Sequence, residues 1–365
     1  MFNRSSDLLL LLSILVVILF SSCETEVELL APYDETPVIY GILDYTADTQ
    51  FVRINKTFLG PGDPSQYTGI KDSVEYDPAD VVAVINKYND DGGSLSTITL
   101  EPIDIPSREP GIFYSEDVRF YYTSQQLLTA EQQLNQEEYI FELNATIKEE
   151  VYSAETRFPG LSVSTIELPF LTAGDPQRMF FVLNGVNMNF SSETFRFTTD
   201  EFTASYSAAF RMNFDYVLND GTVVEGAFID YDLGDFGNEE LGSNQDITIS
   251  LFGENLYTFW GNQLDLIPDL AEVQIEILEF RVTGATPELN TYLEVAQPVS
   301  QFTPVLSSFT NITNGAIGIF SSVATRSRDA YLSEPSLQKL NESPLTNSYN
   351  YCVQGWSGSN YLCNP

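Results

Sequence analysis

Alternation of apolar and polar residues with a period of two constrains the fold of this 365-residue chain more than any other feature. Its longest instance is ASYSAAFRMNFDY, in which every second residue from Ala204 to Tyr216 is apolar or aromatic. Such a period places alternate side chains on opposite faces of a β-strand. Similar segments recur along the chain, and turn-forming runs at Asn89–Gly93 and Leu218–Thr222 predict β-hairpins. The pattern predicts an all-β fold.

The first group of strand-length segments occupies residues 36–158 and predicts an immunoglobulin-like β-sandwich. Within it, Thr129 and Gln132 have the spacing of a capping box, which predicts a helical turn. Tyr139 then opens a strand, and this order resembles the tyrosine corner of immunoglobulin-like sandwiches. Pro159-Gly160 marks the end of this predicted domain.

The second group occupies residues 161–330 and predicts a β-sandwich-like domain with one short helix. A change of phase between Ile277 and Leu278 predicts a β-bulge. Thr286-Pro287 has the residue types of a helix N-cap and first helical position, so the short helix should begin there. Residues 331–365 form a predominantly polar segment, for which we predict a C-terminal tail with a disulfide loop.

The charge of the chain excludes some classes of partner. Lys and Arg number 16 against 52 Asp and Glu, which gives a formal net charge of -36. Nucleic acid would be repelled by this charge, so we expect no nucleic-acid partner. Hydrophobic residues make up 43% of the chain and aromatic residues 13%, a composition too apolar for a disordered acidic chain.

The chain contains no histidine. Catalysis by Ser-His-Asp or Cys-His groups and zinc sites with histidine ligands are therefore excluded. An enzyme would have to rely on carboxylates, Tyr, Lys or a metal held by oxygen atoms, and a carboxylate-dependent hydrolase is the least favoured interpretation. We predict that the protein is not an enzyme.

The amino terminus has the features of a lipoprotein signal peptide. Residues 8–20 form an uncharged apolar run, too short to span a membrane, behind the basic residue Arg4. Phe20-Ser21-Ser22-Cys23 resembles a bacterial lipobox, which predicts cleavage of residues 1–22 and acylation of Cys23. The alternative is a free or disulfide-bonded thiol. Acylation would anchor the protein to a membrane through lipid.

Residues 23–35 predict an acidic tether behind the lipidated cysteine. Glu24, Glu26 and Glu28 resemble a surface-export signal of Bacteroidota lipoproteins, although they alternate with other residues. The alternative is a plain solvated tether. The sequence thus favours the cell surface over the periplasmic face of the outer membrane.

Cys352 and Cys363 are the cysteines that remain once Cys23 is assigned to lipid. Because an exported protein meets an oxidising compartment, we predict a disulfide between them. A reactive thiol pair is the alternative, which no Cys-x-x-Cys spacing supports.

An acidic cluster and one tryptophan are further candidate ligand sites. Asp230, Asp232 and Asp235 are a weak candidate for calcium, since the EF-hand pattern fails in this segment, and a solvated acidic hairpin end is favoured. We therefore expect no cofactor. Trp356 lies in a Gly/Ser-containing segment and could contact a glycan or pack against the disulfide, whereas Trp260 is expected in the core.

A family resemblance extends over most of the chain after Cys23. Its motifs are the lipobox with its acidic tether and the runs TPVIYGILD, SYSAAFRMNFDY, VTGATPELNTYLEVAQP and FTNITNGAIGIFSS. With these motifs the chain resembles an uncharacterised family of Bacteroidota outer-membrane lipoproteins, domain of unknown function 4249. The resemblance implies a β-rich lipoprotein anchored in the outer membrane, and it implies no activity.

These observations predict a binding or accessory subunit of an outer-membrane protein complex. Its expected partners are the membrane, through the lipid, and an outer-membrane protein. The alternative is a surface glycan-binding lipoprotein of a polysaccharide-uptake system.

Overall fold

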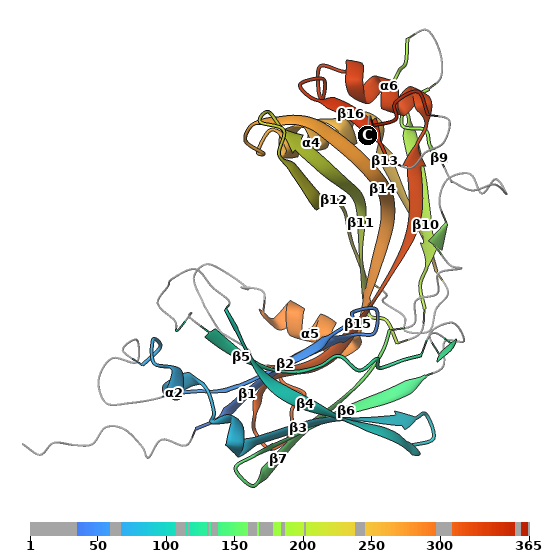
Figure 1. Cartoon of the computed structure of the whole chain (residues 1–365). Helices are drawn as coiled ribbons and strands as arrows, with labels where there is room; N and C mark the ends of the chain where they lie inside the picture. The colour runs from blue at the N-terminus through green and yellow to red at the C-terminus, as the bar shows by residue number, and fades with distance from the viewer. Residues whose placement is uncertain are drawn as a thin grey trace, which may run out of the picture.

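The fold is described from a computed structural model of the chain. It describes residues 35–58, 67–106, 114, 117–129, 131–132, 138–159, 166–167, 178–183, 187–200, 202–237, 245–296, 309–354 and 359–363. Most of these residues lie in strands, as the alternation predicts. Figure 1 shows two lobes that meet along one long strand, β15 (Ile317–Leu332).

The N-terminal lobe is built from seven consecutive strands. They are β1 (Pro37–Asp44), β2 (Gln50–Lys56), β3 (Val81–Asn89), β4 (Ser94–Pro106), β5 (Asp117–Thr123), β6 (Tyr139–Ile147) and β7 (Glu150–Arg157). Two short helices lie between β2 and β3, α2 (Lys71–Val74) and the 3₁₀ helix η2 (Pro78–Asp80). The predicted hairpin over Asn89–Gly93 is confirmed, since β3 and β4 flank this turn and pair antiparallel.

Strand β4 belongs to both layers of this lobe. Its first half pairs with β3 and its second half with β5, so the strand order runs β15-β1-β2-β5-β4-β3-β6-β7. Alternate residues of the two layers face each other in one core, which includes Ile39 and Val52 from one layer and Ile85 and Phe141 from the other. The same core also includes Ile312, Ala316 and Phe320, from the range predicted for the second domain.

The C-terminal lobe contains the rest of the large sheet and a smaller one. Its strands are β8 (Ile166–Glu167), β9 (Arg178–Met179), β10 (Ser192–Thr198), β11 (Ser205–Leu218), β12 (Val223–Gly237), β13 (Asp246–Phe252), β14 (Leu270–Ala285) and β16 (Asn350–Val353). The large sheet has 13 strands and ends β15-β14-β11-β12, while β13-β10-β8 form the small sheet. The sheets share an aromatic core, in which the ring of Phe195 lies 4.7 Å from that of Phe280.

Two local sequence predictions are confirmed in this lobe. The hairpin over Leu218–Thr222 joins β11 to β12. The register of β14 shifts between Ile275 and Ile277, because Glu276 is the extra residue, one position from the predicted bulge. The bulge allows Val273 and Ile275 before it, and Leu278 after it, all to be buried.

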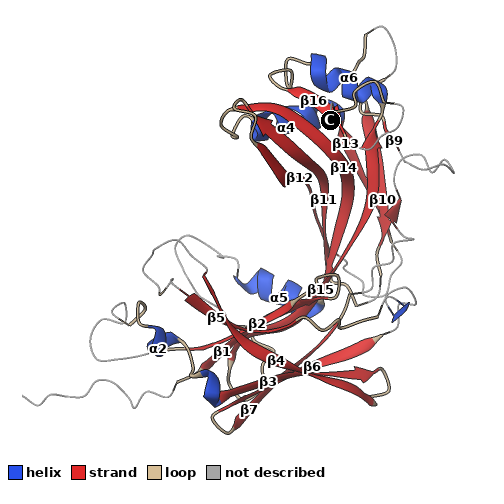
Figure 2. Ribbon diagram, viewed as in Figure 1, coloured by secondary structure: helices blue, strands red, loops and turns tan. Residues whose placement is uncertain are grey.

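The prediction of one short helix in the second domain was wrong. The C-terminal half of the chain contains α4 (Gly253–Leu264), α5 (Pro287–Ala296) and α6 (Glu334–Glu342), as Figure 2 shows. Only α5 was expected, with Thr286 as its cap: Leu289 N lies 3.4 Å from Thr286 Oγ1. Helix α4 buries Leu256, Trp260 and Leu264, whose spacing is helical.

Residues 331–353 are packed rather than a loose tail. Leu332, Leu337, Leu340 and Tyr351 are buried in the core of the C-terminal lobe. The cause is local: Ser333 caps α6, which places two leucines on one helix face, and β16 then pairs with β14. The segment is polar on average, so its composition did not predict the few apolar residues that pack in the core.

Candidate docking surface

Outward-pointing aromatic and aliphatic side chains gather on the sheet of the N-terminal lobe. We call this surface the aromatic face; its residues are Tyr40, Ile42, Phe51, Phe120 and Tyr122. Tyr40 is 37% exposed, Ile42 47% and Phe51 39%, whereas their strand neighbours Ile39 and Val52 are buried. Strand β1 and the paired ends of β2 and β5 that carry these residues are therefore apolar on both faces, so apolar side chains are not confined to the buried face.

Strand pairing holds the rings of the aromatic face together. Phe51 on β2 lies opposite Tyr122 on β5. Their ring centroids are 6.2 Å apart at an interplanar angle of 27°, and the ring of Phe120 lies 5.9 Å from Phe51. Because both strands belong to a packed sheet, the rings are presented on a rigid support.

Helix α5 borders the aromatic face. Thr286 and Ser321 hydroxyl groups lie 2.5 Å apart and join the start of α5 to β15. On the helix, Tyr292 donates a hydrogen bond to the hydroxyl of Tyr40 (3.3 Å), and their rings meet edge to face. This hydrogen bond, with burial, raises the pKa of Tyr292 to about 12, so the phenol of Tyr292 is neutral at physiological pH. Leu293, half exposed, extends the apolar surface.

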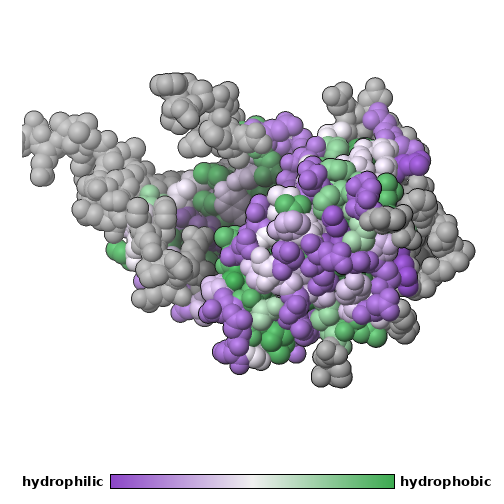
Figure 3. All heavy atoms as spheres, turned by 90° about the horizontal axis from the view of Figure 1, so that it is seen from above, coloured by the Kyte–Doolittle hydropathy of each residue, from purple (hydrophilic) through white to green (hydrophobic). Residues whose placement is uncertain are grey.

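Helix α5, which borders the aromatic face, lies on the side of the N-terminal lobe that is turned toward the C-terminal lobe (Figure 1). Seen from above, hydrophobic residues lie in a recess beside a largely hydrophilic surface (Figure 3). The five side chains carry two phenol groups and no carboxylate, amine or thiol. Such a surface can bind a partner by apolar contact and by hydrogen bonds from its phenols.

Several predicted site residues lie outside the described residues. Cys23, Glu24, Glu26, Glu28 and Trp356 are all in this group, so the lipidation, export and glycan-contact predictions stay predictions. Within the described part of the chain, no helix is long and apolar enough to cross a membrane. Trp260 is fully buried, as expected, and its ring stacks on Phe210.

The three aspartates proposed for calcium are on β12 and do not converge. Arg211 binds Asp230 with two hydrogen bonds of 2.7 Å, and Asp232 accepts a hydrogen bond from Gly234 N. Asp235 follows a register shift in the strand. Among the described residues, no group of three acidic, histidine or cysteine side chains is placed to hold a metal ion.

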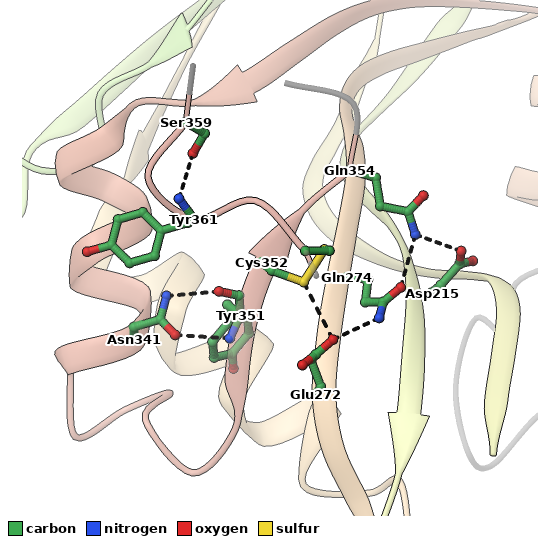
Figure 4. Close-up of a disulfide and its surroundings, with 10 residues drawn as sticks. Asp215, Glu272, Gln274, Asn341, Tyr351, Cys352, Gln354, Ser359 and Tyr361 are labelled. Atoms are coloured by element: carbon green, nitrogen blue, oxygen red, sulfur yellow. Dashed lines mark hydrogen bonds between the residues drawn. A yellow bond between two sulfur atoms is a disulfide. The ribbon is translucent and has the colours of Figure 1, made fainter. Parts of the chain in front are cut away.

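Cys352 and Cys363 form a disulfide, the pair that the cysteine count predicts. The loop that it closes is attached to the large sheet, as Figure 4 shows. Gln354 donates to Asp215 (2.9 Å) and to Gln274 (3.3 Å). These contacts join Gln354, directly after β16, to the large sheet of the C-terminal lobe.

No protein-family model matches the chain, and no curated protein matches its sequence. The resemblance to the Bacteroidota lipoprotein family therefore stays a prediction. The aromatic face was missed by sequence reasoning, although a signal was present. The runs PVIYGIL and FYY are apolar or aromatic at consecutive positions, which indicates a strand with two apolar faces.

Proposed function

We propose that the protein is a non-catalytic, lipid-anchored accessory subunit that binds an outer-membrane protein through the aromatic face. The observation that carries this proposal is the exposure of Tyr40, Ile42 and Phe51 on a rigid sheet. Aromatic residues are enriched at the energetic centre of protein interfaces, and contiguous exposed apolar surface is uncommon on monomers. The lipobox at Cys23 supports the membrane location.

The proposal includes a finer fold assignment. We propose that the N-terminal lobe is an immunoglobulin-like sandwich and the C-terminal lobe a second sandwich-like domain. The strand orders support the immunoglobulin-like assignment of the N-terminal lobe. The order β1-β2-β5-β4 corresponds to immunoglobulin strands A-B-E-D, and the order β4-β3-β6-β7 corresponds to C′-C-F-G. In this correspondence β4 serves as both C′ and D. The packing of β10 on β11 and β14 supports the second.

Affinity purification of the acylated full chain in mild detergent tests the partner. We expect it to recover a defined membrane protein, and the double substitution Phe51→Ser/Tyr122→Ser to reduce recovery at least about tenfold, as loss of a hot spot does. Leu266→Ser is the matched control, since Leu266 is an exposed leucine of the C-terminal lobe. Equal recovery with the double variant and the control would remove the aromatic face from the proposal.

A glycan ligand is the second candidate function, favoured by the paired rings of Phe51 and Tyr122. Flat aromatic surfaces can stack on sugar rings. A polysaccharide array probed with the full chain tests this function. Binding that falls with Phe51→Ala but not with Leu266→Ser supports it, and the absence of any bound polysaccharide counts against it.

The membrane location has its own test. Protease treatment of intact cells should degrade the wild-type protein, if it is on the cell surface. The Cys23→Ala variant, which cannot be acylated, should leave the membrane fraction. Protection of the wild-type protein in intact cells would place it on the periplasmic face instead.

A further inference from the structure

Strand β12 forms one end of the 13-stranded sheet. It is 15 residues long and pairs with β11 along one edge. In the described part of the chain, no other strand pairs with its second edge. The N–H and C=O groups that point away from β11 are thus available to an added strand.

At the opposite end of the large sheet, the outer edge of β7 is covered by hydrogen bonds from another segment of the chain. On β7, Ser153 exchanges hydrogen bonds with Thr313: Thr313 N donates to Ser153 O (2.9 Å) and Ser153 N donates to Thr313 Oγ1 (2.8 Å). The side chain of Asn314 donates to Val151 O (2.5 Å). Among the described residues, the chain therefore covers backbone groups at the β7 end and pairs no strand with the outer edge of β12.

The open edge has a regular central stretch. Register shifts interrupt the β11–β12 pairing on either side of Ala227–Asp232, and within this range each residue has one partner on β11. At roughly 3.4 Å per residue, the stretch is about 20 Å long. That length suits a strand of about six residues, which is a common strand length in proteins.

Side chains on the outward face of this stretch indicate the chemistry of the partner. Phe228 is 55% exposed, with the guanidinium of Arg211 over its ring, and Asp230 and Asp232 follow at alternate positions. Strand β12 carries four carboxylates and no basic residue. Opposite charges across a strand pair are favourable and like charges are not, so a second copy of β12 is disfavoured.

We propose that the Ala227–Asp232 edge of β12 binds an extended basic segment of a partner protein by strand addition. Backbone hydrogen bonds provide the attachment, and a Lys or Arg of the added strand faces Asp232, because Asp230 is already paired with Arg211. This site is distinct from the aromatic face and does not depend on it. The high negative charge of the whole chain accelerates the approach of such a segment.

Hydrogen exchange of the detergent-solubilised full chain tests the proposal with two synthetic peptides. One alternates Lys and Val; the other has the same sequence with every backbone amide N-methylated, so it keeps the charge and lacks the N–H donors of a strand. We expect the Lys-Val peptide to slow exchange within residues 223–237 by about tenfold or more at saturation, and the N-methylated peptide to leave it unchanged. Equal effects of the two peptides, or protection elsewhere only, would overturn the proposal.

Charge reversal supplies a second, matched comparison. Asp232→Lys should weaken binding of the Lys-Val peptide several-fold, whereas Asp48→Lys, in the exposed β1–β2 turn, changes net charge equally and should not. An unchanged affinity in Asp232→Lys contradicts the proposed register. Slowed exchange in β12 that depends on protein concentration without peptide would assign the edge to a second copy, against the proposal.

Discussion

Glu193 holds a carboxyl group in the core of the C-terminal lobe. It is 4% exposed, and its Oε1 accepts a hydrogen bond from Phe180 N (2.5 Å). Burial raises its pKa above the ordinary value of 4.5, and the hydrogen bond from Phe180 offsets part of this shift. A raised pKa in the folded state means that protonated Glu193 stabilises the fold relative to its ionised form.

The pH dependence of unfolding follows from this sign. The contribution of Glu193 is fully present below pH 4.5 and is lost as pH rises through the pKa of the folded state. We expect Glu193→Gln to raise the thermal midpoint at pH 7 and to change it little at pH 4, because the amide oxygen can still accept from Phe180. Glu101→Gln, at an exposed position of β4, is the control. A midpoint at pH 7 equal to or below that of the wild type would contradict the prediction.

At the scale of single elements, sequence patterns located strands better than helices. The alternation predicted β11, and the phase change predicted the bulge in β14 to within one residue. The capping box is also present, since Thr129 and Gln132 exchange hydrogen bonds of 3.0 and 3.2 Å. Helix α4 was missed because DITISLF reads as a strand and the helical spacing begins directly after it.

The aromatic face and the shared strand could not be predicted in the same way. A period-two pattern identifies the buried face of a strand from its apolar side chains. Tyr40 and Phe51 are aromatic side chains on the opposite, exposed face, so this pattern does not identify them. Their proximity to α5 depends on the parallel pairing of β1 with β15, across more than half of the chain. No local pattern specifies such a pairing, because it is decided by the packing of the complete sheet.

Helix α4 packs closely against the segment that follows α6. A Cβ atom added at Gly261 would lie 2.1 Å from the carbonyl oxygen of Leu345. Alanine normally stabilises a helix relative to glycine by about 1 kcal/mol. We expect Gly261→Ala to destabilise the protein by about 1–3 kcal/mol instead, because the backbone of Leu345 must move.

Chemical denaturation measures this effect. Asn262→Ala, at the exposed neighbouring position of α4, is the control and should change stability by less than about 0.5 kcal/mol. A stabilised Gly261→Ala variant would show that the helix does not pack against residue 345 in solution.

The disulfide between Cys352 and Cys363 closes a short loop after β16. The cysteines are separated by 11 positions, and a loop of this size stabilises a fold by roughly 2–3 kcal/mol through the unfolded state. We expect the double variant Cys352→Ser/Cys363→Ser to lower the unfolding free energy by about this amount. Treatment of the wild type with a reductant should reproduce the loss, and an unchanged variant would show that the loop contributes nothing.

The two lobes of the whole molecule have separate cores but share β15. Residues Val38–Asp44 of β1 pair in parallel with the first part of β15, and from Val323 the same strand pairs antiparallel with β14. Tyr45 packs against both cores, and the guanidinium of Arg326 lies over its ring. A perturbation on β15 should therefore reach both lobes, while one on a strand confined to a single lobe should not.

Two core phenylalanines of the N-terminal lobe allow a matched test of this coupling. Phe320 is on β15 and Phe141 is on β6, and both are fully buried in the same core. Either Phe→Ala substitution should cost about 3–5 kcal/mol locally. We expect Phe320→Ala, but not Phe141→Ala, also to speed hydrogen exchange of the β14 amides, because β15 carries the distortion into the neighbouring sheet. Exchange of β14 that is unchanged in both variants would mean that the lobes open independently, and the aromatic face and the open β12 edge would then act as separate binding sites.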